Sequence, residues 1–281
     1  MPRALPEGFI WGTSTAAHQV EGGNWNSDWW AWEHDPSSPC VEPSGDACNQ
    51  YHLYEQDLDM LQGLGFGAYR LSVEWARIEP EEGEFSTAQL DHYLRVCEAC
   101  GERGLKPVVT FHHFTSPRWI TAAGGWDRPS TADRFARFCD RTANHLGGAI
   151  AAACTINEPN IVAQLGYEEG RFAPGKRDPG ARDRANEVFA DAHGKGRDAI
   201  RGHSDAPVGI TLAMSAYEAV DGREDKLREL RSRDEDIYLE AARDDDFFGV
   251  QTYTRKRIGP SGNLGPEEGV ETTLMGYEFY P

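Results

Sequence analysis

The chain has 281 residues, of which 39% are hydrophobic and 26% are charged, a balance that excludes disordered and collagen-like proteins. Its 46 acidic residues outnumber its 28 Lys and Arg residues, so the formal net charge is −18. An acidic surface repels phosphate groups, and we expect no nucleic acid and no membrane as a partner. Residues 1–6 lack the apolar core of a secretory signal, and no stretch approaches the ~20 apolar residues of a membrane-spanning helix. These features indicate a cytoplasmic location.

Short apolar runs alternate along the chain with longer segments in which apolar residues recur at helical spacing. In chain order the pattern predicts a strand at 9–13, a helix at 49–64, a strand at 68–75, a helix at 87–102, a strand at 107–113, a helix at 131–146, a strand at 152–157, a helix at 183–202, a strand at 207–214, a helix at 235–243 and a strand at 247–253. Six strands that alternate with five helices indicate one parallel sheet with helical crossovers.

Two architectures fit such a sheet, an open doubly wound sheet and a TIM barrel. The run at 12–17 after the first strand lacks the G-x-G-x-x-G pattern that a dinucleotide-binding sheet needs. Polar and aromatic residues stand instead at the ends of several strands: Gln19, Trp75, His113, Asn157, Glu158 and Tyr253. Residues spread over many strand ends are typical of the catalytic face of a barrel, whereas an open sheet gathers them at one switch point. The sequence therefore predicts an α/β TIM barrel.

Glu158 is the first candidate for chemistry. It follows the apolar strand at 152–157, and a carboxyl group at the mouth of a buried strand loses hydration, which raises its pKa. A raised pKa suits a general acid near neutral pH, and the neighbouring Asn157 can hydrogen-bond a substrate hydroxyl. The alternative is a carboxylate at the start of a helix, bound to backbone N–H groups, with Pro159 at the first helical position.

His112 and His113 end the strand at 107–113. Adjacent side chains of a strand point to opposite faces, so the two rings cannot chelate one metal ion. We expect one ring to face the pocket and the other to face a helix. A metal site would need two further His, Cys or Asp ligands at suitable spacing, and we predict neither a metal nor another cofactor.

Tryptophan is abundant near the start of the chain, where residues 25–32 hold four of the eight. A Trp-rich mouth with interspersed polar side chains suits sugars, which present C–H faces for stacking and hydroxyls for hydrogen bonds. For each single Trp, packing in the core is the alternative. The acidic runs at 234–236 and 244–246 flank the last predicted helix, and we expect both to be solvated caps.

Five motifs in the same order resemble glycoside hydrolase family 1, the family of β-glucosidases and β-galactosidases. They are FIWGTSTAAHQVEG at 9–22, YRLSVEWARIEP at 69–80, FHHFTSPRW at 111–119, TINEP at 155–159 and FAPG at 172–175. The resemblance covers essentially the whole chain. It implies a TIM barrel that hydrolyses β-glycosides with retention, for which two carboxyl groups stand ~5–5.5 Å apart.

The resemblance also implies roles for single residues. Glu158 would be the catalytic acid/base. The residues that would bind the sugar are Gln19, His113 and Asn157. Arg70 and Tyr253 would orient the nucleophile. Gln251 stands where the family usually has Asn, which weakens any role carried over to that position.

The largest departure from the family concerns the nucleophile. In the family this residue is a Glu in a Thr-Glu-Asn-Gly-like motif at the end of the seventh strand. No such motif occurs in residues 1–281, and Glu278 belongs to the segment before that strand. We therefore expect residues 1–281 to form one incomplete barrel with about six of the eight strands. An unclosed barrel leaves two open sheet edges and an open core.

Three hypotheses follow from the resemblance and its departure. The chain is a C-terminally truncated retaining β-glycosidase that acts on a β-glycoside but is weak or inactive alone. It is one piece of a barrel, completed through its open edges by another chain or by a second copy. It is a non-catalytic protein that binds a simple sugar or another partner.

Overall fold

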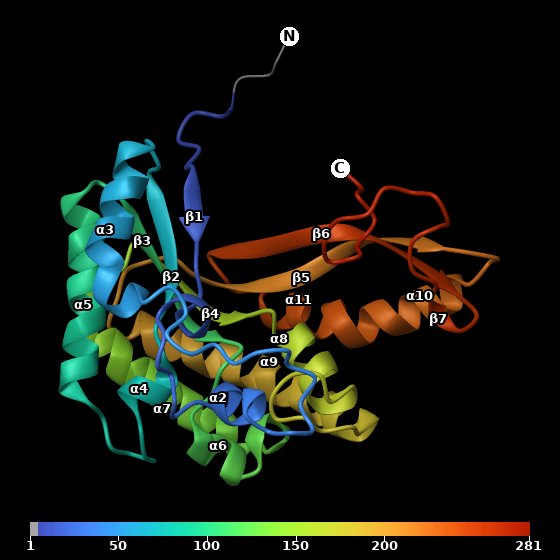
Figure 1. The fold of residues 1–281 in the computed structure, drawn as a ribbon, viewed down its shortest axis with the longest axis horizontal. Coiled ribbons are helices and arrows are strands. Elements are labelled where there is room, and N and C mark those ends of the chain that lie inside the picture. Colours follow the sequence, from blue (N-terminus) through green and yellow to red (C-terminus); the bar gives the residue numbers. More distant parts are fainter. Residues whose placement is uncertain (1–4) are drawn as a thin grey trace.

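The computed structural model describes residues 5–281, which form one curled sheet flanked by helices (Figure 1). Six parallel strands follow one another in chain order, and a short seventh pairs antiparallel with the sixth. They are β1 (Gly12–Ser14), β2 (Ala68–Ser72), β3 (Lys106–His113), β4 (Ala152–Asn157), β5 (Val208–Ala219), β6 (Phe247–Gly259) and β7 (Gly262–Asn263). The order of β1 to β6 has no reversal, which agrees with the barrel prediction and not with a doubly wound sheet.

Helices flank the curled sheet, and the long ones α5, α7 and α9 cover its outer side (Figure 1). They are α1 (Ala17–Val20), α2 (Asp28–Glu33), α3 (Gln50–Gly63), α4 (Trp75–Ile78), α5 (Thr87–Glu102), α6 (Arg118–Ala122), α7 (Ser130–Leu146), α8 (Pro159–Ile161), α9 (Pro179–Arg201), α10 (Glu224–Arg231) and α11 (Ile237–Ala241). Short 3₁₀ turns span Gly125–Asp127 and Gly147–Ala149, and π-helical turns span Val162–Glu168 and Ser232–Asp236. Among the described helices, none combines the length and the apolar character needed to span a bilayer.

The hydrophobic core lies between the sheet and the long helices α5, α7 and α9. Trp75 is fully buried there and stacks on Phe138 of α7, with ring centroids 5.1 Å apart. Phe189 of α9 stacks on Trp126, with centroids 4.1 Å apart. These large aromatic side chains join neighbouring helices to one another, so the helical layer and the sheet form one packed unit.

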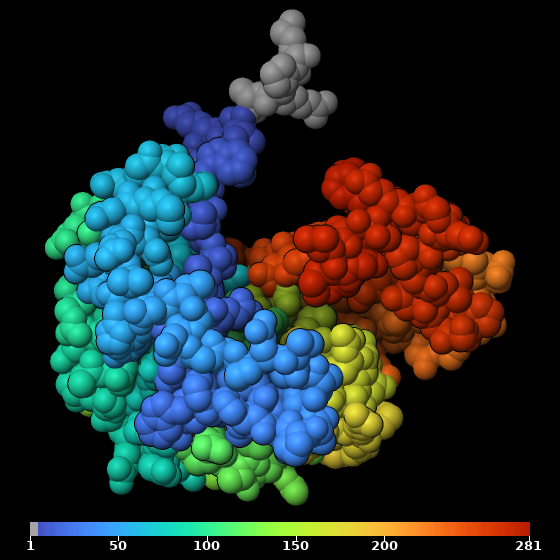
Figure 2. Space-filling view, in the orientation of Figure 1, coloured from blue at the N-terminus to red at the C-terminus, as the bar shows by residue number. Residues whose placement is uncertain are grey.

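The two outer strands of the sheet stay apart. Within the described residues, β1 pairs only with β2, and β6 pairs with β5 and the short β7. Figure 2 shows a hollow between the blue N-terminal segment and the red C-terminal segment. Apolar side chains stand exposed at both sides, among them Trp11 before β1 and Val250 on β6. The described residues thus form a barrel that is open between β1 and β6.

Local sequence signals predicted most element bounds within a few residues, and α5 and β4 have the predicted bounds. The predicted strand at 9–13 starts only at Gly12, because pairing with β2 begins there. The predicted strand at 68–75 ends at Ser72, since the carboxylate of Glu74 accepts from the backbone N–H of Ala76 and caps α4. β5 and β6 continue beyond their predicted ends as a paired ribbon.

The prediction that both acidic runs are solvated caps is wrong for Asp234, Glu235 and Asp245, whose side chains are buried, whereas Asp236, Asp244 and Asp246 are exposed. Asp234 pairs with Arg182, while Asp245, whose side chain is 2% exposed, pairs with His193 and Arg197. The reason is that all three basic partners lie on α9, some fifty residues away in the sequence. A buried charge is tolerated when such a partner compensates its lost hydration.

Candidate active site

The site predicted from the sequence lies where β3 and β4 end, beside residues within β2, β5 and β6. The pairing register puts His113 of β3 beside Asn157 of β4, and Asn157 beside Thr211 of β5. Arg70 of β2 and Gln251 of β6 reach the same place through their side chains. Because the carboxyl ends of parallel strands meet at one rim, residues that are far apart in the sequence gather there.

Arg70 donates hydrogen bonds to side chains of several strands in this site. Its Nη2 donates to Asn157 Oδ1 over 2.8 Å, and its Nη1 donates to Gln251 Oε1 over 3.0 Å. Its Nε donates to Thr110 Oγ1 over 2.9 Å. The guanidinium is planar and carries its donors in fixed directions. With donors committed to three strands, Arg70 holds both amide side chains in defined orientations.

Glu158 follows β4 directly and is only 5% exposed. Its Oε1 accepts from Gln251 Nε2 over 2.6 Å and from the hydroxyl of Tyr253 over 2.9 Å. Burial raises the pKa of Glu158 above its ordinary 4.5, while the two hydrogen bonds and the charge of Arg70 act in the opposite direction. The net effect is a pKa above 4.5, which is the direction of shift that a general acid needs.

His113 and His112 point to opposite faces of β3, as predicted. Burial, followed by the charge of Arg70, lowers the pKa of His113 to about 3, so its ring is neutral at pH 7. His113 Nδ1 has no hydrogen-bond partner within residues 5–281. His112 packs against helices instead, with its ring centroid 4.9 Å from Trp126 and 5.8 Å from Phe189. Residues 5–281 contain no cluster of three or more His, Cys, Asp or Glu side chains that would hold a metal ion.

An aromatic wall stands beside His113. Phe114 lies 4.9 Å from the His113 ring and 5.7 Å from Phe172, and Phe172 lies 4.7 Å from Trp29, all between ring centroids. Trp29 in turn lies 6.0 Å from His18. We refer to Phe114, Phe172 and Trp29 as the aromatic wall. It extends from the end of β3 towards α1, which carries Gln19.

Of the predicted site residues, the structure joins Arg70, Asn157, Glu158 and Tyr253 in one hydrogen-bond network. Gln19 is exposed on α1 and outside that network. Sequence reasoning undervalued Gln251, which links Arg70 to Glu158 through both ends of its amide. Its spacing is a signal, since Gln251 and Tyr253 are two residues apart on β6 and share one face of the strand.

Comparison with known proteins identifies relatives of the chain. The model of glycosyl hydrolase family 1 matches residues 1–259. Beta-glucosidase A of Acetivibrio thermocellus is 34% identical over 221 residues, which are 76% of this chain and 49% of that protein. Beta-glucosidase A of Thermotoga maritima is 33% identical over 237 residues, which are 82% of this chain and 53% of that protein. The chain spans about half the length of these curated relatives.

Solved structures show the same fold. The β-glycosidase BGL167 matches with a TM-score of 0.90 and 45% identity over 98% of this chain and 72% of that one. The β-glycosidase from Pyrococcus horikoshii matches with a TM-score of 0.92 and 28% identity over 100% of this chain and 71% of that one. The described residues are thus part of a TIM barrel, with six of its parallel strands. The chain belongs to glycosyl hydrolase family 1.

Proposed function

We propose that this chain carries the acid/base half of a retaining β-glycosidase that hydrolyses O-glycosyl bonds, as the named β-glucosidase relatives do. The observation that carries the proposal is the buried carboxyl of Glu158, whose pKa is raised at the rim of the strands. Glu158 would protonate the oxygen of the leaving aglycone and later, as a carboxylate, take a proton from water.

The sugar would lie between the polar rim and the aromatic wall. We assign its hydroxyls to Gln19, His113 and Asn157. A neutral imidazole at His113 can donate from one nitrogen and accept at the other, and its Nδ1 is free of protein partners within residues 5–281. The C–H face of a sugar ring would pack on an aromatic side chain of the wall, such as Trp29.

The nucleophile is the second part of the proposal. A retaining site needs another carboxyl group ~5–5.5 Å from the acid/base, and we propose that residues 1–281 do not supply it. This is supported by the surroundings of Glu158, because within residues 5–281 no carboxylate contributes to its pKa shift. Glu278 is engaged elsewhere, with its two oxygens 2.7 and 3.1 Å from nitrogens of Arg255. Arg70 and Tyr253 would orient the nucleophile once it is present.

Turnover of aryl β-glucosides by purified residues 1–281 tests both parts. We expect a rate far below the ~10 s⁻¹ of a typical enzyme. Azide replaces a missing nucleophile: its nitrogen bonds to the anomeric carbon while the bond to the aglycone oxygen breaks. With phenyl β-glucoside, whose leaving group needs a proton, azide should accelerate the native chain but not Glu158→Gln. With 2,4-dinitrophenyl β-glucoside, which needs no proton, azide should accelerate both.

Two results would contradict the proposed function. Full turnover without azide that is lost in Glu158→Gln would mean that residues 1–281 contain their own nucleophile. An azide effect on phenyl β-glucoside that is equal in both variants would remove Glu158 from the role of acid. Calorimetry with gluconolactone distinguishes the enzyme from the non-catalytic alternative. Binding of gluconolactone without any azide-dependent turnover would favour a sugar-binding protein.

We also propose that another polypeptide, which supplies two further strand–helix units, closes the barrel between β1 and β6. The proposal is supported by the open edges of these strands and by the exposed Trp11 and Val250 beside them. Light scattering of residues 1–281 mixed with the unmatched part of BGL167 should show a one-to-one complex. A stable dimer of residues 1–281 that ignores this piece would instead favour closure by a second copy.

A further inference from the structure

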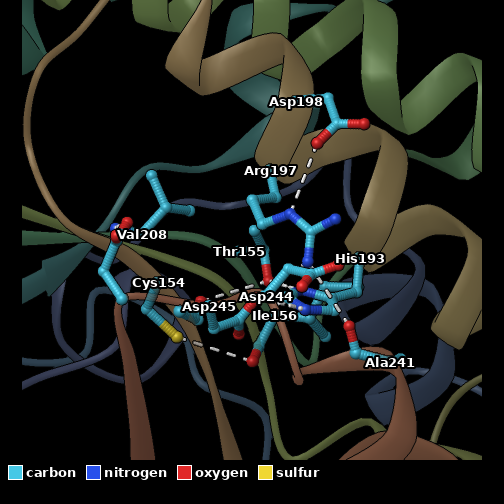
Figure 3. Close-up of polar contacts among 12 residues, drawn as sticks. Cys154, Thr155, Ile156, His193, Arg197, Asp198, Val208, Ala241, Asp244 and Asp245 are labelled. Carbon is cyan, nitrogen blue, oxygen red and sulfur yellow. Dashed lines mark hydrogen bonds and ion pairs between the residues drawn. The ribbon is translucent and has the colours of Figure 1, made fainter.

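We propose that the buried side chains of His193 and Asp245 form a positioning device that holds an irregularity in β4 and thereby aims Asn157 and Glu158 into the site. The role of Glu158 rests on the proposed function, whereas its position does not. The device lies between β4, α9 and the segment before β6 (Figure 3).

The irregularity is a β-bulge between β4 and β5. Cys154 pairs with Gly209 and Asn157 pairs with Thr211, so three steps along β4 face two steps along β5. A bulge inserts a residue into one strand, bends it and re-aims the side chains that follow, and bulges are frequent beside active sites. Glu158 comes directly after this one, and its backbone N–H donates to the carbonyl of Thr211 over 2.8 Å.

Side-chain contacts show how the bulge changes the direction of β4. In a regular strand, residues two apart share a face, which would put Thr155 and Asn157 on one side. Here Thr155 Oγ1 contacts His193 on the helical side, whereas Arg70 contacts both Asn157 Oδ1 and Cys154 Sγ on the site side. Without the bulge, Asn157 would turn towards the helices and away from Arg70.

The backbone of Glu158 shows why the bulge needs support. Its φ is +46°, in the left-handed region that residues other than glycine adopt only when their surroundings hold them there. The hydrogen bond to Thr211 fixes the residue after the bulge. The contacts of Thr155 fix the residue inside it.

The device itself is a continuous hydrogen-bond chain (Figure 3). Thr155 Oγ1 lies 2.7 Å from His193 Nδ1 and 3.3 Å from the carbonyl of Gly209, on the β5 side of the bulge. The carboxylate of Asp245 accepts from His193 Nε2 over 3.0 Å and from Arg197 over 3.2 Å. Thr155 is thus tied to the partner strand and, through His193, to a carboxylate before β6.

The order hydroxyl, imidazole, carboxylate resembles that of a nucleophilic triad, but its burial excludes that role. The side chain of His193 is 0% exposed and that of Asp245 is 2% exposed, and Thr155 is buried as well. No substrate can reach a hydroxyl in this position. The hydrogen bonds of Thr155, His193 and Asp245 therefore have a positioning role: they fix where β4 ends and how the residues after it are oriented.

The variants Thr155→Val and Thr155→Ser test the device. Both side chains are close in size to that of Thr, but only Ser keeps the hydroxyl. The readout is the ¹³C NMR titration of the Glu158 carboxyl, assigned by its loss in Glu158→Gln. We expect Thr155→Val to bring the pKa of Glu158 down towards its ordinary value and to weaken gluconolactone binding about tenfold. Thr155→Ser should titrate like the native chain.

A second variant and a control complete the experiment. Asp245→Asn keeps the size of the side chain but removes its charge, and it should change the Glu158 titration in the same direction as Thr155→Val. His203→Ala removes an exposed pair with Asp140 and should leave the titration unchanged. If Thr155→Val and Asp245→Asn lower only the thermal midpoint and Glu158 titrates as before, the inference is wrong. The titration could shift as expected while neither the native chain nor any variant shows azide-dependent turnover. In that case the positioning role of His193 and Asp245 is supported and the proposed function is wrong.

Discussion

At the scale of single residues, two side chains of β6 influence the protonation of Glu158. Gln251 and Tyr253 both donate to the same carboxylate oxygen, Oε1. These donors favour the ionised form, while burial favours the protonated form and has the larger effect. The position where the family usually has Asn thus carries a longer amide that reaches from Arg70 to Glu158.

Removing one donor should raise the pKa of Glu158 further. Tyr253→Phe deletes the hydroxyl that stabilises the carboxylate, so protonation becomes easier and the titration moves to higher pH. The measurement is the NMR titration of Glu158 in both chains. Tyr277→Phe is the matched control, because the Tyr277 ring lies 6.3 Å from that of Tyr253, between centroids, and has no hydrogen bond to Glu158. A downward shift in Tyr253→Phe would contradict this balance of forces.

The sequence indicated part of this site and not the rest, for a physical reason. His113 and Asn157 end β3 and β4, Glu158 follows Asn157, and local pattern predicted the ends of these two strands correctly. The bond from Tyr253 to Glu158 and the bridge through Gln251 depend on which strands become neighbours. That arrangement follows from the whole sheet and leaves no trace in the spacing of nearby residues.

At the scale of elements, local signals succeeded where they match the packing. α5 and β4 have apolar residues at the expected period and clear boundaries, so their bounds were predictable. α10 was missed because its sequence, EDKLRELR, has only Leu227 and Leu230 as apolar residues, and none of its residues is buried. The buried Asp245 was taken for a surface residue because its partners lie on α9.

Two glycines of α9 provide a matched test of how tightly this helix packs. A Cβ on Gly196 would meet Phe135 at 2.8 Å and Cys139 at 3.2 Å, whereas a Cβ on Gly194 would meet nothing within 4 Å. We expect Gly196→Ala to lower the free energy of unfolding by about 1–3 kcal/mol through overpacking. Gly194→Ala should raise it by about 0.5–1 kcal/mol, since Ala favours helix over Gly.

Denaturant unfolding followed by circular dichroism measures both free energies. The signs should be opposite although the substitutions are the same and only two positions apart. Equal effects of the two variants would mean that α9 does not press against α7 as closely as the structure has it.

At the scale of the whole molecule, the main feature is the opening of the barrel between β1 and β6. The sequence predicted the parallel sheet and the barrel class, because chemistry-bearing residues were spread over many strand ends. The curled sheet with β1 to β6 in order has that form. Parallel strands normally lie covered on both faces, so the open side between β1 and β6 is the feature that most constrains the function of residues 1–281.

A charge on the open side should interfere with closure. Val250 of β6 is 59% exposed, and Val250→Lys should weaken the complex with the unmatched part of BGL167 by at least about tenfold, because a lysine ammonium is strongly hydrated and resists burial. Val41→Lys is the control, since Val41 is 99% exposed and belongs to the segment between α2 and α3, outside both edge strands. Light scattering over a concentration series gives both affinities. Equal affinities of the two variants would place the partner elsewhere.

Glu158 should hold a proton at the rim of the strands more strongly than an ordinary glutamate does. The direct measurement is the ¹³C NMR titration of the Glu158 carboxyl in the purified chain, with Glu158→Gln to assign the signal. We expect a midpoint above the ordinary 4.5. A midpoint at or below that value would contradict it, because burial would then not strengthen the binding of a proton by Glu158.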